Sequence, residues 1–561
     1  MKIIGFQSGH DVSYCVLEDG VPVIHNEWER FLRKKEPQGD GLKFLFTNEG
    51  NSSHLENVDY FTHGNPRTRY GVWAHKNDPD NGEFPCNEIE FNDKMLSYKV
   101  PYREVSHHLS HAANAFFSSN FDTALIVTLD GGGWEICKDY GEDFLPIDVA
   151  CAATCHMGYG NKIDPLAVQP SEKVNIGQFW DICVRDVLGL SIGYPNGHAA
   201  GTLMAMAAHG DIPKDPCYTE ASSNEIINLV EQIYKNSSTG ARGSVKKLKE
   251  YAEADKNNPF NVAAAVQWYT ENVVRSIITH YKNEISKMDI KPTKLCIAGG
   301  VALNSVMVGK IYDWFPDIEE VYVPPVPHDA GLSIGSAQYL YHHILDNPRV
   351  TWNGNASPYL GKTYSKEDVM DAVNTHELLF EEVTDDDVIE LISKDDNVVS
   401  VFGGGSESGK RALGNRSILA DPRSKTMKSI INEKVKHRQS FRPFAPSILR
   451  EEVSKWFVRD VDSPYMTCVI DFKDEVVDKV PAVCHTDNSA RLQTVTEQDN
   501  YWYYNFIKKF GDKTGVPILL NTSFNDREPI VETPDNAITC FQKTDIDYLY
   551  FFDYGILIKK Q

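Results

Sequence analysis

Three consecutive glycines at residues 403–405 follow the apolar run at residues 398–402, and they restrict what this part of the chain can fold into. The backbone N–H groups of such a turn can face an anion. A triple-glycine turn alone is most often only a turn. Next to it, however, this acidic protein has a basic cluster, which is costly unless an anion lies among its side chains, so the stretch predicts a phosphate site. The basic residues are Lys410, Arg411, Arg416, Lys436, Arg438 and Arg442.

Length and composition limit the class of protein. The 561 residues are 41% hydrophobic and carry a formal net charge of −23, which is typical of a soluble enzyme of several domains. The negative charge argues against broad adhesion to nucleic acid, although one basic groove would suffice for it. No run of about 18 uncharged apolar residues occurs, and the chain starts directly with KIIGF. We therefore expect no membrane span, no signal peptide and a cytoplasmic location.

A pair of histidines precedes a second glycine-rich turn. His107 and His111 are four residues apart in an expected helix that Ser106 can cap, so both imidazoles lie on one helix face. The buried strand at residues 124–130 then ends in Asp130 and three glycines. A HxxxH pair alone is more often incidental than a ligand pair, but this neighbouring acid and turn favour a metal site beside a phosphate loop.

The start of the chain carries a further acidic turn. Gly9, His10 and Asp11 lie at the tip between two strands of the hairpin expected over residues 2–26. A lone aspartate at a strand end is ordinarily only a turn residue. Residues 27–35, EWERFLRKK, predict an amphipathic helix on the surface.

Three stretches together resemble one family: RALGNRSILADPR at residues 411–423, RPFAPSI at 442–448 and LLNTSFN at 519–525. They are similar to the NodU/TobZ family of ATP-dependent O-carbamoyltransferases, and the resemblance extends over nearly the whole chain. It implies an α/β fold with a duplicated actin-like (ASKHA) ATPase-type N-terminal domain, similar to the tRNA threonylcarbamoyltransferase subunit. It also implies an α+β YrdC-like C-terminal domain.

This resemblance divides the chain into domains. We expect the N-terminal domain at residues 1–350, a linker rich in Asn, Pro, Gly and Ser at residues 351–360, and the C-terminal domain at residues 361–561. Within the first domain, strands and phosphate loops recur in two halves, from residue 1 to about residue 130 and from about residue 295 onward, as expected of a duplicated fold.

The resemblance implies a carbamoyl-transfer site in the N-terminal domain. Asp11 would be the general base on the acceptor hydroxyl. A divalent ion, either iron or magnesium, would be held by His107, His111 and Asp329, with Asp130 nearby. The nucleotide would contact the second phosphate loop and an adenosine motif, whose residues are Gly131, Gly132, Gly299, Gly300 and Asn304.

The resemblance also implies a site for carbamoyl phosphate and ATP in the C-terminal domain. Carbamoyl-adenylate would form there before the carbamoyl group passes to the acceptor. Arginines suit such a site because a guanidinium binds phosphate oxygens bidentately and keeps its charge. Lys436 and Arg442 are the expected catalytic residues. The other expected phosphate-binding residues are Arg411, Arg416, Arg438, Arg491, Asn521 and Ser523.

The sequence departs from the family pattern at two points. Ala200 and Thr202 stand where a Glu and a Lys are usual, and the lost lysine would weaken phosphate binding rather than abolish it. Asp526 and Arg527 stand where relatives often have an apolar residue and a glycine. Arg527 is either an additional phosphate contact or a surface charge.

Two other classes of function stay open. An actin-like kinase or ATPase would produce ADP and ignore carbamoyl phosphate, and the basic cluster after residue 400 counts against it. A carbamoylating subunit acting on tRNA or on a hydroxymethylated nucleobase is disfavoured by the net charge. The favoured acceptor is a hydroxyl of a small molecule such as a natural product or sugar, bound by loops in residues 36–98 and 135–175. A homodimer stays open, and no membrane partner is expected.

Overall fold

The structure is a computed structural model of the chain, and it divides into two compact units. The first unit comprises Met1–Glu29 and Lys35–Asn353, and the second comprises Arg30–Lys34 and Gly354–Gln561. The expected linker and the expected acceptor loop at residues 36–98 lie partly outside the described residues, so both stay predictions. The structure describes residues 1–39, 41, 44–45, 52–66, 88–91, 94–97, 100–141, 143–190, 199–212, 224–237, 241–287, 291–350, 358–394 and 396–560.

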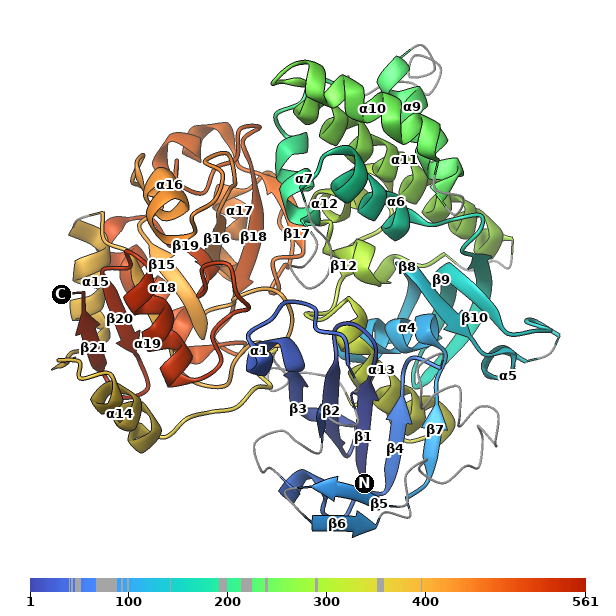
Figure 1. Ribbon diagram of the computed structural model, residues 1–561, viewed down its shortest axis with the longest axis horizontal. Helices are drawn as coiled ribbons and strands as arrows, with labels where there is room; N and C mark the ends of the chain where they lie inside the picture. Colours follow the sequence, from blue (N-terminus) through green and yellow to red (C-terminus); the bar gives the residue numbers. More distant parts are fainter. Residues whose placement is uncertain are drawn as a thin grey trace. The chain divides into compact units, whose positions relative to one another are not determined.

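Two five-stranded sheets of the same topology form the framework of the first unit (Figure 1). In each sheet three successive strands pair antiparallel, and two later strands are added in parallel on the other side of the first strand. This repeat confirms the duplicated actin-like α/β fold. The first sheet has the order β3 (Val21–Glu27), β2 (Ser13–Glu18), β1 (Lys2–Gln7), β4 (Tyr60–His63), β7 (Tyr102–Glu104), and the second has the order β10 (Lys162–Pro170), β9 (Val149–Tyr159), β8 (Thr123–Glu135), β11 (Lys294–Ala298), β12 (Glu320–Tyr322).

The boundary between the two halves differs from the expectation. Strand β8, which carries Asp130, is the first strand of the second sheet, as β1 is of the first sheet. The first half therefore ends before residue 123 and not at residue 130. The predicted boundary was wrong because β8 pairs with β11 of the second sheet, and such pairing is not visible in the order of the elements along the chain. Asp11 after β1 and Asp130 in β8 thus stand at comparable places in the two copies.

Two helices pack against these sheets and against each other. Helix α4 (His107–Ser118) packs against β8, β9 and β11, and helix α13 (Leu332–Gln338) packs against β1, β2 and β4. Every residue of α4 is buried, and Ala112 and Phe116 share a core with Ile126 of the second sheet. Side chains at the start of α4 therefore lie inside the first unit.

A helical group covers the second sheet. Its longest member is α11 (Asn258–Ser286), whose Val274 and Ile278 share a core with Leu125 and Val127 of β8. The other described helices and strands of the first unit are α5 (Cys137–Tyr140), α6 (Ile176–Ile182), α7 (Ala200–Ala207), α9 (Glu225–Lys235), α10 (Arg242–Ala254), α12 (Ser305–Trp314), β5 (Glu88–Phe91) and β6 (Lys94–Ser97).

The second unit is built on one nine-stranded mixed sheet, in agreement with the expected α+β class. Val388 of α15 and Phe506 of α18 share a core with Val399 and Leu419 of the sheet. The strand order is β13 (Glu381–Glu382), β21 (Ile556–Lys559), β20 (Tyr548–Phe551), β14 (Val399–Phe402), β15 (Arg416–Ala420), β19 (Ile518–Ser523), β16 (Ala445–Leu449), β18 (Ser489–Val495), β17 (Cys468–Asp471), and the helices are α14 (Lys366–Thr375), α15 (Asp385–Lys394), α16 (Met427–Ile430), α17 (Val453–Trp456), α18 (Tyr501–Thr514) and α19 (Pro534–Lys543).

The surface helix expected at residues 27–35 is wrong in length and in environment. Helix α1 covers only Trp28–Leu32, and Arg30 is only 3% exposed. Residues 30–34 belong to the second unit, where Arg30 and Arg33 donate to backbone carbonyls. An amphipathic pattern does not reveal partners that lie several hundred residues away in the chain.

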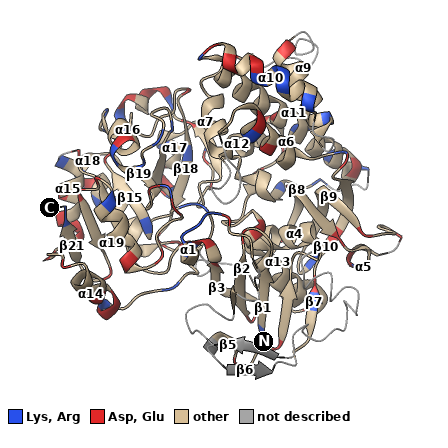
Figure 2. Ribbon diagram, in the orientation of Figure 1, with Lys and Arg blue, Asp and Glu red and all other residues tan. Residues whose placement is uncertain are grey.

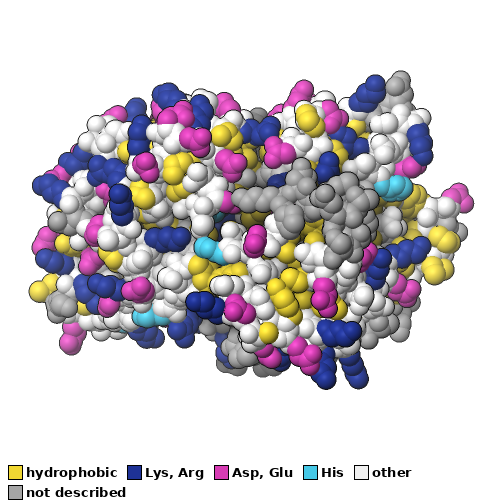
Figure 3. Space-filling view, turned by 90° about the horizontal axis from the view of Figure 1, so that it is seen from above, with side chains coloured by type: hydrophobic (Ala, Val, Ile, Leu, Met, Phe, Trp, Pro, Cys, Tyr) yellow, Lys and Arg dark blue, Asp and Glu magenta, His cyan; other side chains and the backbone are white. Residues whose placement is uncertain are grey.

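Charges of both signs are interspersed on the described surface. Figure 2 shows Lys and Arg beside Asp and Glu along α9, α10 and α11, and Lys246 lies 3.8 Å from Glu250 on α10. The face drawn in Figure 3 has the same mixture. The described part of the face in Figure 3 shows no one-signed stripe of the kind that sequence-independent binding of nucleic acid needs. None of the described helices is long and apolar enough to cross a membrane.

Candidate functional site

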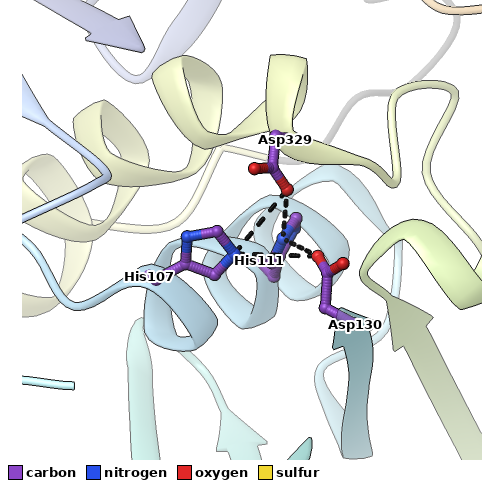
Figure 4. A group of neighbouring side chains, drawn as sticks. All are labelled: His107, His111, Asp130 and Asp329. Carbon is purple, nitrogen blue, oxygen red and sulfur yellow. Dashed lines mark hydrogen bonds and ion pairs between the residues drawn. The ribbon is translucent and has the colours of Figure 1, made fainter. Parts of the chain in front are cut away.

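Four side chains predicted as metal ligands converge in the first unit (Figure 4). His107 and His111 come from α4, Asp130 from β8, and Asp329 from the short 3₁₀ turn Asp329–Gly331 that precedes α13. One ligand atom from each residue lies within 4.8 Å of the others. His111 Nε2 is 2.9 Å from Asp130 Oδ2 and 3.5 Å from Asp329 Oδ1, and His107 Nε2 is 3.6 Å from both carboxylates.

The start of α4 is fixed by two carboxylates, one from the last residue of β8 and one from α5. Glu135 Oε1 accepts a hydrogen bond from the backbone N–H of His108 (2.7 Å). Asp139 Oδ2 accepts from both the backbone N–H and the hydroxyl of Ser106 (2.7 Å each). Ser106 stands at the N-cap position, but its side chain does not cap the helix as expected. Acidic side chains at a helix N-terminus stabilise it, so two carboxylates that the sequence analysis missed hold His107 in place.

A bulge in β8 turns Asp130 towards the histidines. Leu129 pairs with Ala153 and Gly133 pairs with Cys151, so residues 130–132 face a single partner residue. The inserted residues leave the ladder, as in β-bulges beside active sites generally. A Cβ atom on Gly133 would lie 2.3 Å from the His107 ring, so the glycine is what lets this imidazole lie against the strand.

Hydrogen bonds from the first sheet hold the turn that carries Asp329. The hydroxyl of Ser13 donates to the carbonyl of Ala330 (2.7 Å), and His25 Nε2 lies 2.9 Å from the same oxygen. Asn114 of α4 donates to the carbonyl of Val326 (2.8 Å), just before the turn. Asp329 is therefore positioned by the first sheet and by α4.

The donor set fits a divalent ion. His107 Nε2 is buried and has no hydrogen-bond partner among the described residues. Its 3.6 Å separations from Asp130 and Asp329 are too long for hydrogen bonds but match ligands that each lie about 2.1 Å from one shared ion. Although burial opposes the charged form, the contacts with His107 and His111 hold the pKa of Asp130 well below its usual range. A carboxylate that stays ionised in this place is a suitable ligand for a cation.

His10 is a neighbour of this cluster. It was named as part of the turn with Asp11 but was not predicted as a site residue. Its Nε2 lies 3.3 Å from Asp329 Oδ2, and its Nδ1 lies 3.0 Å from Asp11 Oδ2. Asp11 has φ 52°, which directs the loop tip towards the turn with Asp329. His328 Nε2 lies 3.8 Å from Asp11 Oδ1. The predicted base, Asp11, thus lies next to the predicted metal ligands, with His10 between them.

The predicted nucleotide-binding glycines lie beside Asp130. Gly131 and Gly132 are in the bulge itself, and a Cβ on Gly300 would lie 3.2 Å from Asp130 Oδ1. Gly299 has φ 92° and approaches the backbone of Leu129 so closely that a Cβ there would lie 2.1 Å from its carbonyl oxygen. These four glycines therefore form one small-residue region next to the metal ligands.

Asn304 takes part in the fold. Its side-chain oxygen caps α12 by accepting from the backbone N–H of Met307 (3.1 Å), and its amide donates to Gln267 (2.9 Å). Its predicted contact with adenosine stays a prediction. Ala200 and Thr202, where the family pattern has Glu and Lys, lie in the first turn of α7, and Thr202 is buried.

Four arginines gather in the second unit. Burial, followed by repulsion from Arg442, lowers the pKa of Arg411 to about 10 and that of Arg438 to about 9. Burial also lowers the pKa of Arg442. For Arg491 the pKa falls well below its usual range, first through burial and then through repulsion from the other three arginines. Such repulsion is offset when an anion binds among the guanidinium groups.

Two basic residues predicted to bind phosphate make contacts within the fold, and their phosphate contacts stay predictions. Arg416 Nη1 donates to the carbonyls of Gly403 (2.6 Å) and Asn415 (3.0 Å), and its guanidinium stacks on the ring of Phe402. Lys436 Nζ donates to the carbonyl of Asn525 (2.7 Å) and to that residue's side-chain oxygen (2.7 Å). The donors of both side chains are therefore at least partly occupied by the fold.

The polar residues at the end of β19 are also engaged with the fold. Asn521 Nδ2 donates to Gln493 Oε1 (2.9 Å), whereas its buried Oδ1 has no hydrogen-bond partner among the described residues. The hydroxyl of Ser523 donates to Asn525 Oδ1 (2.7 Å). Arg527, predicted as either a phosphate contact or a surface charge, donates to the backbone carbonyl of His437 (3.1 Å).

Comparisons with known proteins agree on one family. Residues 89–338 match the model of the carbamoyltransferase N-terminus, and residues 390–559 match that of the carbamoyltransferase C-terminus. Nodulation protein U of Sinorhizobium fredii is 32% identical, over 94% of this chain and 94% of its own length. An uncharacterized protein of Synechocystis sp. is 30% identical, over 96% of this chain and 94% of its own length.

Two further similarities are more limited. A 3'-hydroxymethylcephem-O-carbamoyltransferase of Amycolatopsis lactamdurans is 28% identical, over 59% of this chain and 60% of its own length. Among solved structures, full-length HypF in the phosphate- and nucleotide-bound form has a TM-score of 0.30 and 12% identity, over 61% of this chain and 46% of that chain. The chain thus spans less than half of that larger protein.

Proposed function

The chain belongs to the carbamoyltransferase family, and from this premise we propose that it is an ATP-dependent O-carbamoyltransferase that uses carbamoyl phosphate and a carbamoyl-adenylate intermediate. The observation that carries the proposal is the group of four partly buried arginines in the second unit, Arg411, Arg438, Arg442 and Arg491, in which repulsion between neighbours lowers the pKa of Arg411, Arg438 and Arg491. A kinase on an actin-like fold has no use for a second anion site of this kind. An enzyme that must hold carbamoyl phosphate and the phosphates of ATP does.

In the second unit the arginines would bind the two phosphate-bearing substrates. Guanidinium groups stay charged and grip phosphate oxygens in pairs, so they stabilise the charge that shifts as phosphate and pyrophosphate leave. Asn521 Oδ1, the buried acceptor without a hydrogen-bond partner, could receive an N–H of the carbamoyl group. Water releases phosphate from carbamoyl phosphate to leave carbamate, carbamate displaces pyrophosphate from ATP, and the alcohol then displaces AMP. Overall, carbamoyl phosphate, ATP, water and an alcohol give a carbamate ester, phosphate, AMP, pyrophosphate and protons, which balances in atoms and charge.

In the first unit Asp11 would take the proton from the acceptor hydroxyl as that oxygen attacks the carbamoyl carbon. His10 supports this role because its Nδ1 lies 3.0 Å from Asp11 Oδ2 and orients the carboxylate. His107, His111, Asp130 and Asp329 would hold a divalent ion, iron or magnesium. When bound, such an ion supplies positive charge for the adenylate phosphate and polarises the carbamoyl group.

The acceptor is proposed to be an alcohol on a small molecule. One relative is named for a reaction on 3'-hydroxymethylcephem, which presents a primary hydroxyl. The interspersed charges on the described surface favour such an acceptor over a nucleic acid. Primary alcohols of natural products are therefore the first compounds to test.

The test follows the carbamoyl carbon. Carbamoyl phosphate labelled at that carbon is incubated with ATP and each of a panel of alcohols, including 3'-hydroxymethylcephem and an oligonucleotide with a hydroxymethylated base. We expect ATP-dependent label in a small-molecule alcohol, no label with Asp11→Asn, and normal labelling with Asp317→Asn, whose side chain is 67% exposed. Label in the oligonucleotide alone would refute the proposed acceptor, and no ATP-dependent label in any acceptor would refute the proposed reaction.

A further inference from the structure

A short N-terminal segment belongs to the second unit. The chain leaves the first unit after Glu29, contributes Arg30–Lys34 to the second unit, and returns to the first unit at Lys35. Within the second unit this segment contributes two arginines whose donors bind backbone carbonyls of other parts of that unit. The predicted C-terminal domain, residues 361–561, therefore lacks a piece of its own structure.

Arg30 holds the loop that leads to the arginine cluster. Its side chain is 3% exposed, and Nη2 donates to the carbonyls of Glu407 (2.9 Å) and Gly409 (2.8 Å). Gly409 has φ 91°, a conformation that favours glycine. Lys410 and Arg411 come next in the chain, so the two carbonyls fixed by Arg30 immediately precede the cationic residues.

The same loop is closed by the side chain of Glu407. Its Oε1 accepts hydrogen bonds from the backbone N–H groups of Leu413 (2.7 Å), Asn415 (2.8 Å) and Arg416 (3.1 Å). Residues 407–416 thus form a ring in which Glu407 is held from one side by Arg30 and binds three N–H groups on the other. Arg411 lies within this ring, and its position depends on both ends.

Charge balance supports the same role for Arg30. Burial raises the pKa of Glu532, while Arg416 and Arg30 both act to lower it. The Ser406 hydroxyl donates to the Glu532 carboxylate (2.8 Å). Two buried arginines therefore accompany two buried glutamates, Glu407 and Glu532, and removing one member of such a group leaves an uncompensated charge.

We propose that Arg30 is a positioning residue for the anion site, because it fixes the loop of residues 407–416 and thereby Arg411. This inference rests on the proposed function, in which Arg411 binds carbamoyl phosphate or ATP. It makes a segment from the start of the chain necessary for the first chemical step. A fragment that starts at residue 361 is accordingly expected to bind carbamoyl phosphate weakly.

The test uses the full chain with Arg30→Met, Arg30→Lys and, as matched control, Arg33→Met. Arg33 lies in the same segment, but it donates to the carbonyls of Ile530 (2.7 Å) and Pro529 (2.6 Å). Four quantities are measured: the binding of carbamoyl phosphate by calorimetry, its KM, kcat, and the backbone hydrogen exchange of residues 407–416 without ligand.

Arg30→Met is expected to weaken carbamoyl phosphate binding and raise its KM about tenfold, because charged hydrogen bonds to the loop are lost. Exchange at Leu413, Asn415 and Arg416 should become faster. Arg30→Lys should be intermediate, because one ammonium keeps the charge but not the fork geometry. Arg33→Met should lower stability with an unchanged KM for carbamoyl phosphate.

Two results separate this inference from the proposed function. If the wild-type protein binds carbamoyl phosphate and Arg30→Met leaves both binding and loop exchange unchanged, the positioning role is overturned and the proposed function stands. If the wild-type protein does not bind carbamoyl phosphate, the proposed function fails and the positioning role fails with it.

Discussion

His111 Nε2 lies 2.9 Å from Asp130 Oδ2, which joins the first turns of α4 to the bulge of β8. The contact places an imidazole ring against a carboxylate inside the first unit, where His111 is fully buried. Burial lowers the pKa of His111, but the bonds with Asp130 and Asp329 outweigh it and raise the pKa to about 9. A bound cation would replace the proton that this pair otherwise shares.

Replacing His111 tests the proposed metal ligands. His111→Ala should weaken the affinity for a divalent metal and stop carbamoyl transfer. The loss of affinity should exceed the roughly 10–100-fold that is typical when a group that only orients a ligand is replaced. His280→Ala, an exposed histidine on α11, is the control. The measurement is elemental analysis of the purified proteins after equilibration with iron or magnesium. Equal metal content in the two variants would contradict the site.

Gly133→Ala tests the packing of His107. The added methyl group would lie 2.3 Å from the His107 ring, so the ring must move away from Asp130 and Asp329. We expect a loss of stability of about 1–3 kcal/mol together with weaker metal binding. Gly243→Ala is the control, because no atom lies within 4 Å of a Cβ there and the helix α10 should gain up to ~1 kcal/mol. Metal affinity of Gly133→Ala equal to that of the control would refute the packing argument.

Arg491→Met tests the anion site. Losing one charged contact should weaken carbamoyl phosphate binding by roughly 2–3 kcal/mol. Without ligand the variant should be at least as stable as the wild type, because repulsion from Arg411, Arg438 and Arg442 is removed. Thermal unfolding with and without carbamoyl phosphate measures both effects, and exposed Lys508→Met controls for the loss of one charge. A ligand-induced rise in Tm that survives in Arg491→Met would count against the site.

A buried histidine outside the site predicts a dependence of stability on pH. His63 is fully buried and stacks on Phe6 at 4.7 Å, and burial lowers its pKa to about 3. Since the unfolded chain binds this proton near pH 6.5 and the folded chain does not, stability is lost as pH falls below 6.5. His63→Phe should remove about 2 kcal/mol of the change in unfolding free energy between pH 7 and pH 5. Urea unfolding at both pH values measures it, and an unchanged difference between variant and wild type would contradict the assignment.

The sequence and its family resemblance predicted all four residues of the candidate metal cluster but not its surroundings. The four-residue spacing of His107 and His111 follows from helix geometry, so it was visible in the sequence. The contact of His10 with Asp329 was not, because residues more than three hundred positions apart meet only when α13 packs against the first sheet. Its position next to Asp11 was the one available signal.

For the basic cluster, the sequence predicted the kind of residue but not which of its arginines gather in one place. Residue type and spacing predicted cations near the glycine turn, and Arg411, Arg438, Arg442 and Arg491 do come together. Sequence could not distinguish these from Arg416, whose donors are occupied by backbone carbonyls. It also could not assign Arg30 to the second unit, since a charged residue in an amphipathic pattern is ordinarily exposed.

The most direct test of the central claim is the identity of the nucleotide product. Purified protein is incubated with ATP and an alcohol acceptor, with and without carbamoyl phosphate, and the nucleotides are separated and quantified. The account predicts AMP and pyrophosphate that form only when carbamoyl phosphate is present, and little of either with Arg491→Met. ADP as the sole nucleotide product, formed equally without carbamoyl phosphate, would contradict it.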